Sequence, residues 1–132
     1  MTPDDAVTHW IEIAARDHDT AKLLHEHGKY PESVFFCHQT LEKIIKGYYY
    51  SVKRSAPPYI HNLTRLIKEA GIYELLSEEQ KDFIDFLSPL NVRSRYLDEE
   101  ERLLAAMTPE RCGEIVKRTE GLYQWILTLL KK

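Results

Sequence analysis

The chain has 132 residues, the length of a single domain that can bury a core without metals or disulfides. Its 18 basic and 21 acidic residues give a formal net charge of −3, which argues against a broad electrostatic footprint for duplex nucleic acid. We expect a cytoplasmic protein, because the N-terminus shows no leader-like pattern and no window is apolar enough to span a bilayer.

Every long segment of the chain has a helical period, and start and stop signals divide the sequence into five expected helices. Their expected bounds are Thr2 to Gly28, Pro31 to Lys53, His61 to Gly71, Ser77 to about Leu90, and Thr108 onward. The sequence contains no internal repeat and no run of alternating apolar and polar residues that is as long as a strand. The sequence therefore predicts an all-α, up-and-down bundle of four to five helices, with residues 1–132 forming one domain.

The segment from Phe35 to Tyr48 places ionisable groups on a helical face that should be apolar. His38 belongs to an apolar stripe, and Glu42 and Lys46 follow it at steps of one helical turn. Buried ionisable groups must be paired and often mark a site, so these residues predict a polar ladder. The alternative is a structural histidine beside a surface Glu-Lys pair.

Two further residues are candidates for this polar ladder. Asp17 lies in the expected stripe of the first helix, and it would pair with Lys46 or an arginine, or form a simple packing salt bridge. His61 either points toward the ladder or caps the third helix.

Cysteine and histidine spacing gives no support for a metal site or a cofactor. Cys37 and Cys112 lie in helical patterns and are expected to be free, buried thiols. His25 and His27 are two positions apart, so they point to different faces of a helix. We therefore expect neither a metal nor a cofactor.

Several motifs along the chain resemble a known family. They are Ala14…Asp17…Ala21, Gly28-Lys29-Tyr30, Phe36-x-x-Gln39-x-x-Glu42-Lys43-x-x-Lys46, His61-x-Leu63-x-x-Leu66 and Arg95-Tyr96-x-Asp98. In this order they resemble the HEPN domain, named for higher eukaryotes and prokaryotes nucleotide-binding. The resemblance implies a helical bundle that usually forms a homodimer and is commonly encoded beside a minimal nucleotidyltransferase in prokaryotes. Some members are toxins that cut RNA.

The ribonuclease branch of that family pairs an Arg with a His after four to six intervening residues. No His follows Arg93 and Arg95 at that spacing, where the chain is acidic instead. The one literal match, Arg54 with His61, straddles a proline-containing loop, and we interpret it as a coincidence. The chain is therefore expected not to be an efficient enzyme, with a metal-independent ribonuclease toxin as the alternative.

Arg93, Arg95 and Tyr96 form the best candidate ligand-binding group, with Lys46 nearby. Guanidinium groups bind phosphate bidentately, and a tyrosine ring can stack on a base. Alternatively, Arg95 pairs with a neighbouring acidic residue and caps its helix. The sequence thus favours a nucleotide- or RNA-associated binding module. The resemblance further implies that it is the partner of a separately encoded nucleotidyltransferase in a toxin-antitoxin-like pair. A non-catalytic interaction scaffold is the remaining alternative.

A homodimer is also expected from the apolar pattern of the first two helices. Both carry large apolar residues beyond a single stripe, and a two-fold dimer would bury such a patch. These residues are Trp10, Ile11, Ile13, Phe35, Phe36, Ile44 and Tyr49.

Overall fold

The computed structural model describes residues 2–91, 102 and 105–130, and the described elements are all helical. In the described part of the chain, five α-helices have defined bounds: α1 (Pro3–Glu26), α2 (Tyr30–Lys53), α3 (Leu63–Glu69), α4 (Glu78–Leu87) and α6 (Pro109–Leu130). Two short 3-10 helices, η1 (Tyr73–Leu75) and η2 (Ser88–Leu90), flank α4. The described residues contain no β-strand, so the expected all-α class is confirmed.

Side-chain caps set the starts of α1, α4 and α6 close to where the sequence predicts them. The hydroxyl oxygens of Thr2, Ser77 and Thr108 each accept a hydrogen bond from a backbone N–H three residues later, at 3.1 Å. Gly28 and Gly71 adopt positive φ angles of 75° and 81° just after two of the helices end. Local sequence therefore determines most helix boundaries.

The fourth helix ends earlier than the sequence predicts. The α-helix stops at Leu87 and continues only as the 3-10 turn η2, where Pro89 has no N–H to donate to an α-helical ladder. Leu90 is nonetheless fully buried, as its place in the expected apolar face requires.

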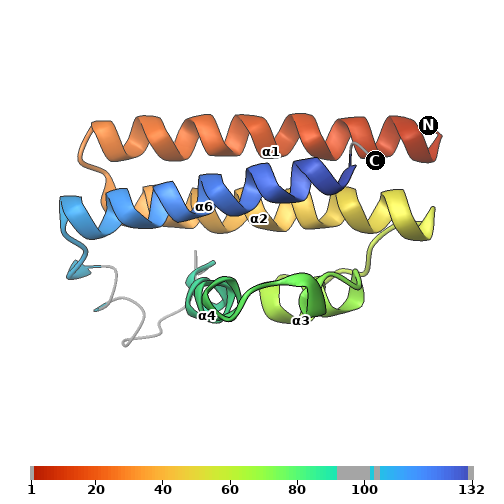
Figure 1. Ribbon diagram of the computed structural model, residues 1–132. Helices are drawn as coiled ribbons and strands as arrows, with labels where there is room; N and C mark the ends of the chain where they lie inside the picture. The colour runs from red at the N-terminus through yellow and green to blue at the C-terminus, as the bar shows by residue number, and fades with distance from the viewer. Residues whose placement is uncertain (1, 92–101, 103–104, 131–132) are drawn as a thin grey trace.

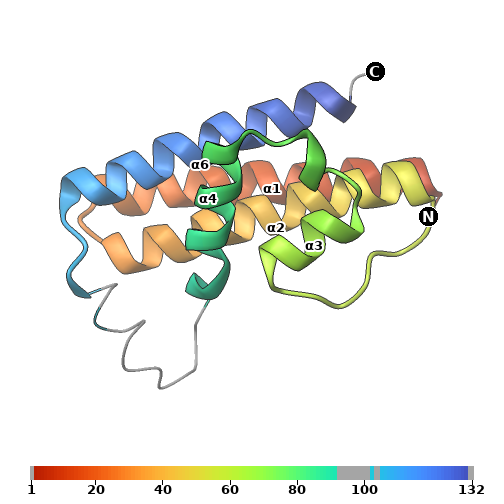
Figure 2. The ribbon, with the colours of Figure 1, turned by 60° about the horizontal axis from the view of Figure 1, so that its bottom comes forward.

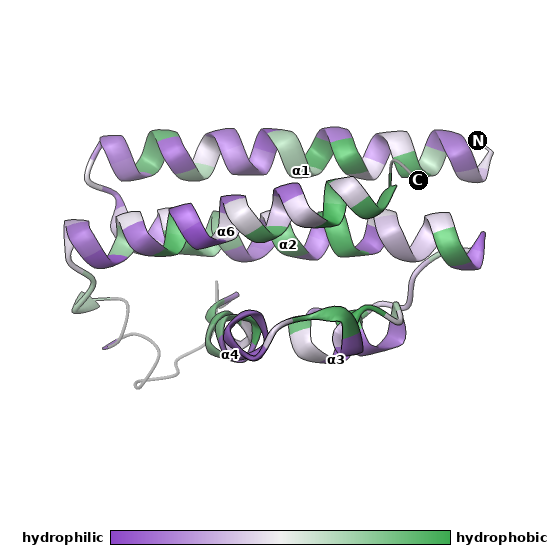
Figure 3. Cartoon of the chain, in the orientation of Figure 1, coloured by the Kyte–Doolittle hydropathy of each residue, from purple (hydrophilic) through white to green (hydrophobic). Residues whose placement is uncertain are grey.

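The three long helices lie side by side, and the two short ones cover one side of α2. Figure 1 shows α1 antiparallel to α2, with α6 running along both. The turned view in Figure 2 shows that α4 crosses the long helices, while α3 lies farther along α2. Hydropathy divides the helices into faces, with hydrophilic stretches on the outer sides (Figure 3).

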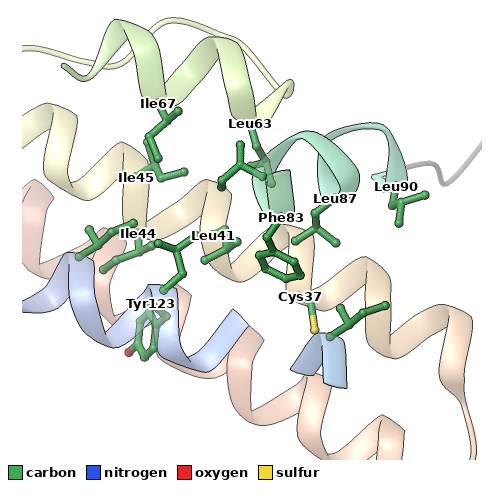
Figure 4. Close-up of a cluster of buried hydrophobic side chains, with 14 of the residues drawn as sticks. Cys37, Leu41, Ile44, Ile45, Leu63, Ile67, Phe83, Leu87, Leu90 and Tyr123 are labelled. Atoms are coloured by element: carbon green, nitrogen blue, oxygen red, sulfur yellow. The ribbon is translucent and has the colours of Figure 1, made fainter. Parts of the chain in front are cut away.

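The core lies where α2 is covered by all the other helices. Leu41, Ile44 and Ile45 of α2 are fully buried, and Figure 4 shows them between residues of α3, α4 and α6. Cys37 and Cys112 are buried and free, as expected. No helix in the described part of the chain has both the length and the apolar character needed to cross a membrane.

Candidate functional site

The carboxylate of Glu42 lies at the centre of a polar cluster on α2. Its Oε2 accepts a hydrogen bond from Lys46 Nζ at 2.9 Å and lies 3.1 Å from His61 Nδ1. Its Oε1 lies 3.8 Å from His38 Nδ1. We call Glu42, Lys46, His61 and His38 the Glu42 cluster. The ladder that the sequence predicts on this helix is thus present, and His61 joins it from outside the helix.

The charged pair in this cluster is buried. The side chains of Glu42 and Lys46 are only 3% and 8% exposed, so the alternative of a surface Glu-Lys pair is wrong. Burial by itself would raise the pKa of Glu42, but the hydrogen bond and charge of Lys46 outweigh that effect, assisted by His38 and His61. The pKa of Glu42 therefore lies below its ordinary value, and the carboxylate stays ionised.

His38 is the innermost member of the cluster and is fully buried. Burial lowers the pKa of His38 to about 4, although the Glu42 charge and the nearby backbone of Ser88 and His61 act in the opposite direction. Neither ring nitrogen reaches a partner at hydrogen-bonding geometry among the described residues. His38 is therefore neutral at pH 7, and its polar atoms are buried at a cost.

His61 forms the outer edge of the cluster. Its side chain is 45% exposed, and its ring meets the exposed ring of Tyr59 edge to face, with 4.7 Å between centroids. The cap of α3 is Asn62 instead, whose Oδ1 accepts a hydrogen bond from Arg65 N at 2.9 Å. Of the two roles that the sequence leaves open for His61, the structure thus shows contact with the ladder.

Trp10 and Gly47 complete the surroundings of Lys46, and the sequence identified neither as its neighbour. The Lys46 ammonium lies 5.7 Å from the centroid of the Trp10 ring, within cation–π range. A Cβ placed on Gly47 would lie 3.2 Å from Trp10 Cβ, so α1 and α2 approach closely here. A glycine inside a helical pattern was the available signal for this approach.

Asp17 lies apart from the Glu42 cluster. Its Oδ2 is 3.8 Å from Lys43 Nζ, and Lys43 also donates a hydrogen bond to Gln39 Oε1 at 2.7 Å. The partner is therefore Lys43 and not Lys46 or an arginine, and the contact joins α1 to α2 as the packing salt bridge that the sequence left open. Burial raises the pKa of Asp17, although the charges of Lys43 and Arg16 act in the opposite direction.

A second buried histidine, His18, lies between α1 and α6 and was not predicted. Its Nε2 is 3.5 Å from Glu120 Oε1, and its ring centroid is 5.4 Å from that of Tyr123. Burial lowers the pKa of His18, as does the charge of Lys22, while Glu120 opposes the shift. The expected stripe of the first helix includes Asp17, one position earlier, which concealed this residue.

The candidate ligand-binding residues Arg93, Arg95 and Tyr96 lie outside the described residues. Lys46, the fourth member of that group, has its charge compensated by Glu42. The two residues of the literal Arg-His match have different partners. Arg54 donates from Nη1 to Asp4 Oδ1 at 2.9 Å on the exposed surface, whereas His61 contacts Glu42.

Within the Glu42 cluster, Glu42 can orient the His61 ring for proton transfer at the surface. The Glu42 carboxylate fixes Nδ1 of His61, and the half-exposed ring leaves Nε2 without a hydrogen bond to any described residue. An imidazole held by a carboxylate can pass a proton to or from a bound molecule. Among the residues that the structure describes, no group of three or more His, Cys, Asp and Glu side chains could hold a metal ion.

Comparisons with known proteins agree with the fold. The solved structure of TT1696 from Thermus thermophilus superposes with a TM-score of 0.75 at 17% identity, covering 92% of this chain and 96% of that one. ST0689, an archaeal HEPN homologue, superposes with a TM-score of 0.72 at 21% identity, covering 94% and 97%. The comparison with curated proteins found no match.

The family model of the HEPN domain matches residues 7–130, which include all five α-helices apart from the first turn of α1. The resemblance seen in the sequence motifs is thereby confirmed over nearly the whole chain. This chain belongs to the HEPN domain family.

Proposed function

We propose that this chain is a nucleotide- or RNA-associated binding module that binds through phosphate and base contacts. Family membership supports the class of ligand, and the Glu42 cluster supports the position of the site. The cluster combines a buried, ionised carboxylate with a histidine that reaches the surface. Such perturbed, paired groups at the surface edge of a fold are typical of binding sites.

The observation that carries this proposal is the meeting of three elements at the cluster. Glu42 comes from α2, and His61 immediately precedes the Asn62 cap of α3. Ser88 of η2 lies with its backbone beside His38, and its Oγ accepts a hydrogen bond from Thr64 N at 3.0 Å. A histidine and an exposed tyrosine thus lie where α2, the start of α3 and η2 meet.

The phosphate-binding groups in this proposal are Arg93 and Arg95, and Tyr96 follows Arg95 in the sequence. They follow η2, whose last residue, Leu90, is buried in the core. Lys46 would contribute only by releasing Glu42, because the two side chains form a buried pair. The exposed ring of Tyr59 offers a surface on which a base can stack.

Calorimetry with several nucleotides and short single-stranded RNAs tests the proposal. We expect binding that weakens as salt is added, because phosphate contacts release counterions. The double variant R93A/R95A should abolish binding while leaving the melting temperature unchanged. A matched variant, K29A/K117A, removes two exposed basic residues elsewhere and should retain binding. No detectable binding at millimolar ligand would favour the scaffold alternative.

The same proposal includes two partners that the family resemblance suggests. The chain would form a homodimer and would act beside a separately encoded minimal nucleotidyltransferase in a toxin-antitoxin-like pair. Co-expression with the product of a neighbouring reading frame, followed by size-exclusion chromatography, tests the second partner. Separate elution of the two proteins at micromolar concentration would argue against it.

A metal-independent ribonuclease is the second candidate, and the contact between His61 and Glu42 favours it. Cleavage at a 2′-hydroxyl needs a group that moves a proton, and His61 is oriented by a carboxylate. An assay on purified protein with labelled RNA decides between the candidates. Cleavage that is lost in both H61A and R54A would show that the Arg54-His61 pair is functional and not coincidental.

A further inference from the structure

Two adjoining hollows lie between α4 and α6, away from the Glu42 cluster. Each has a volume of about 410 Å³, and both are lined by Phe83 and Arg118, so they form one groove. Its apolar surface comes from Phe86 and Ile115 in one hollow and from Trp125 in the other. Phe86 is 37% exposed, so part of its ring is accessible in this groove.

The rim of this groove is acidic. Four carboxylates and two guanidinium groups line it: Glu79, Asp82, Glu110, Glu114, Arg111 and Arg118. Arg118 lies 3.1 Å from Glu114 and 3.7 Å from Glu79, so one arginine already serves two of the four carboxylates. Asp82, Glu110 and Arg111 form no ion pair with any described residue, so the lining of the groove, with four carboxylates and two guanidinium groups, keeps an excess of negative charge beside the apolar floor.

We propose that this groove binds an amphipathic helix of a partner protein whose polar face carries lysine and arginine. Helices bind in grooves by inserting apolar side chains spaced three, four and seven residues apart. Here the two hollows receive those side chains, while Asp82 and Glu110 pair with basic residues flanking them. Charge complementarity of this kind excludes acidic helices, since like charges across an interface repel.

A labelled amphipathic peptide helix of leucine and lysine serves as the probe, with fluorescence anisotropy as the measurement. We expect it to bind at least about tenfold more tightly than a leucine-glutamate helix, or than a scrambled leucine-lysine peptide with no apolar face. The double variant D82K/E110K should lose this preference and bind the glutamate peptide instead. F86A should weaken the binding of both peptides, because the apolar floor is reduced.

The control variant E12K/E26K changes the net charge by the same amount. Its two glutamates are exposed on α1, and Figure 1 shows α1 separated from α4 by α2 and α6. It should bind like the unmodified chain. Equal binding by both control and groove variants, or no preference for the basic helix, would overturn the proposal. A change in oligomeric state caused by D82K/E110K alone would instead assign the groove to a second copy of the chain. None of these outcomes depends on nucleotide binding.

Discussion

His61 and Glu42 are 19 residues apart in the sequence, and their side chains meet with 3.1 Å between Nδ1 and Oε2. The contact crosses from the residue before the α3 cap to the middle of α2, and it brings a half-exposed ring onto a buried carboxylate. One carboxylate oxygen therefore serves both the buried Lys46 and a surface histidine. Glu42 therefore both neutralises the buried Lys46 and holds the half-exposed His61 ring.

Removal of the Glu42 carboxylate should be costly. We expect Glu42→Ala to lower the free energy of unfolding by about 3 kcal/mol, because Lys46 would be left buried without its partner. Denaturant unfolding measures this loss. Glu12→Ala, on the exposed surface of α1, should change it by less than about 0.5 kcal/mol. Adding Lys46→Met to Glu42→Ala should restore part of the stability, since no unpaired charge would remain. A loss as small as that of Glu12→Ala would contradict the buried pairing.

Stability should fall on acidification, mainly through His38. The pKa of His38 is lowered to about 4 in the folded chain, against an ordinary value of 6.5. Between these pH values the unfolded chain binds a proton that the folded chain does not, so the stabilisation is complete above pH 6.5 and is lost as the pH falls toward 4. This linkage corresponds to at most about 3 kcal/mol.

Urea unfolding at a series of pH values tests the His38 contribution. The pKa of His18 is also lowered, and it should add to the slope in the same direction. The variant His38→Met should flatten the dependence of the free energy of unfolding on pH between pH 4 and 6.5. The control variant His27→Gln, at an exposed position, should leave that dependence as it is. An unchanged slope in His38→Met would show that His38 is protonated in the folded state or is not the group responsible.

Two helical glycines should respond oppositely to substitution. At Gly47 a side chain meets Trp10 across the close approach of α1 and α2, so Gly47→Val should destabilise the chain by about 2 kcal/mol. At Gly121 the added Cβ meets nothing within 4 Å, so Gly121→Ala should stabilise α6 by about 0.5–1 kcal/mol. Thermal unfolding of the two variants makes the comparison. Stabilisation by both would mean that the helices separate easily at Gly47.

The homodimer is a prediction that light scattering can decide. The apolar residues from which the sequence predicts it are less exposed than expected, because Ile44 is fully buried and Phe36 and Tyr49 pack against the core. Other large apolar side chains are the most exposed: Tyr59, Leu75, Leu23 and Val52, of which Leu23 lies on α1 and Val52 on α2. We expect the mass of a dimer at micromolar concentration. A monomer over the whole accessible range would remove the two-fold arrangement from the proposed function.

Sequence reasoning was most successful where structure is local. Caps such as Thr2 and Ser77 act within three residues, so the helix starts could be predicted without knowledge of the fold. The roles of Glu42 and Lys46 could be predicted only in part. Their spacing along the helix was evident, but their burial depends on Trp10 of α1 and on His61, which reaches back across the loop that follows α2.

Errors of one position had large effects on partner assignments. Adjacent helical residues point about 100° apart, so assigning Asp17 to the buried stripe concealed His18. The same rotation directs Lys43 toward Asp17 of α1, and its neighbour Glu42 toward Lys46 and His61. His61 lies beside Asn62, and only the structure shows which of the two caps α3.

The placement of α6 has a consequence for protein synthesis. The antiparallel pair α1 and α2 is continuous in sequence and can form as soon as both have been translated, but α6 supplies the contacts that cover His18 and the inner face of α2. Until α6 leaves the ribosome, a nascent chain exposes apolar surface that attracts chaperones or other chains. During synthesis, the chain is therefore most prone to aggregation before α6 has formed its contacts with α1 and α2.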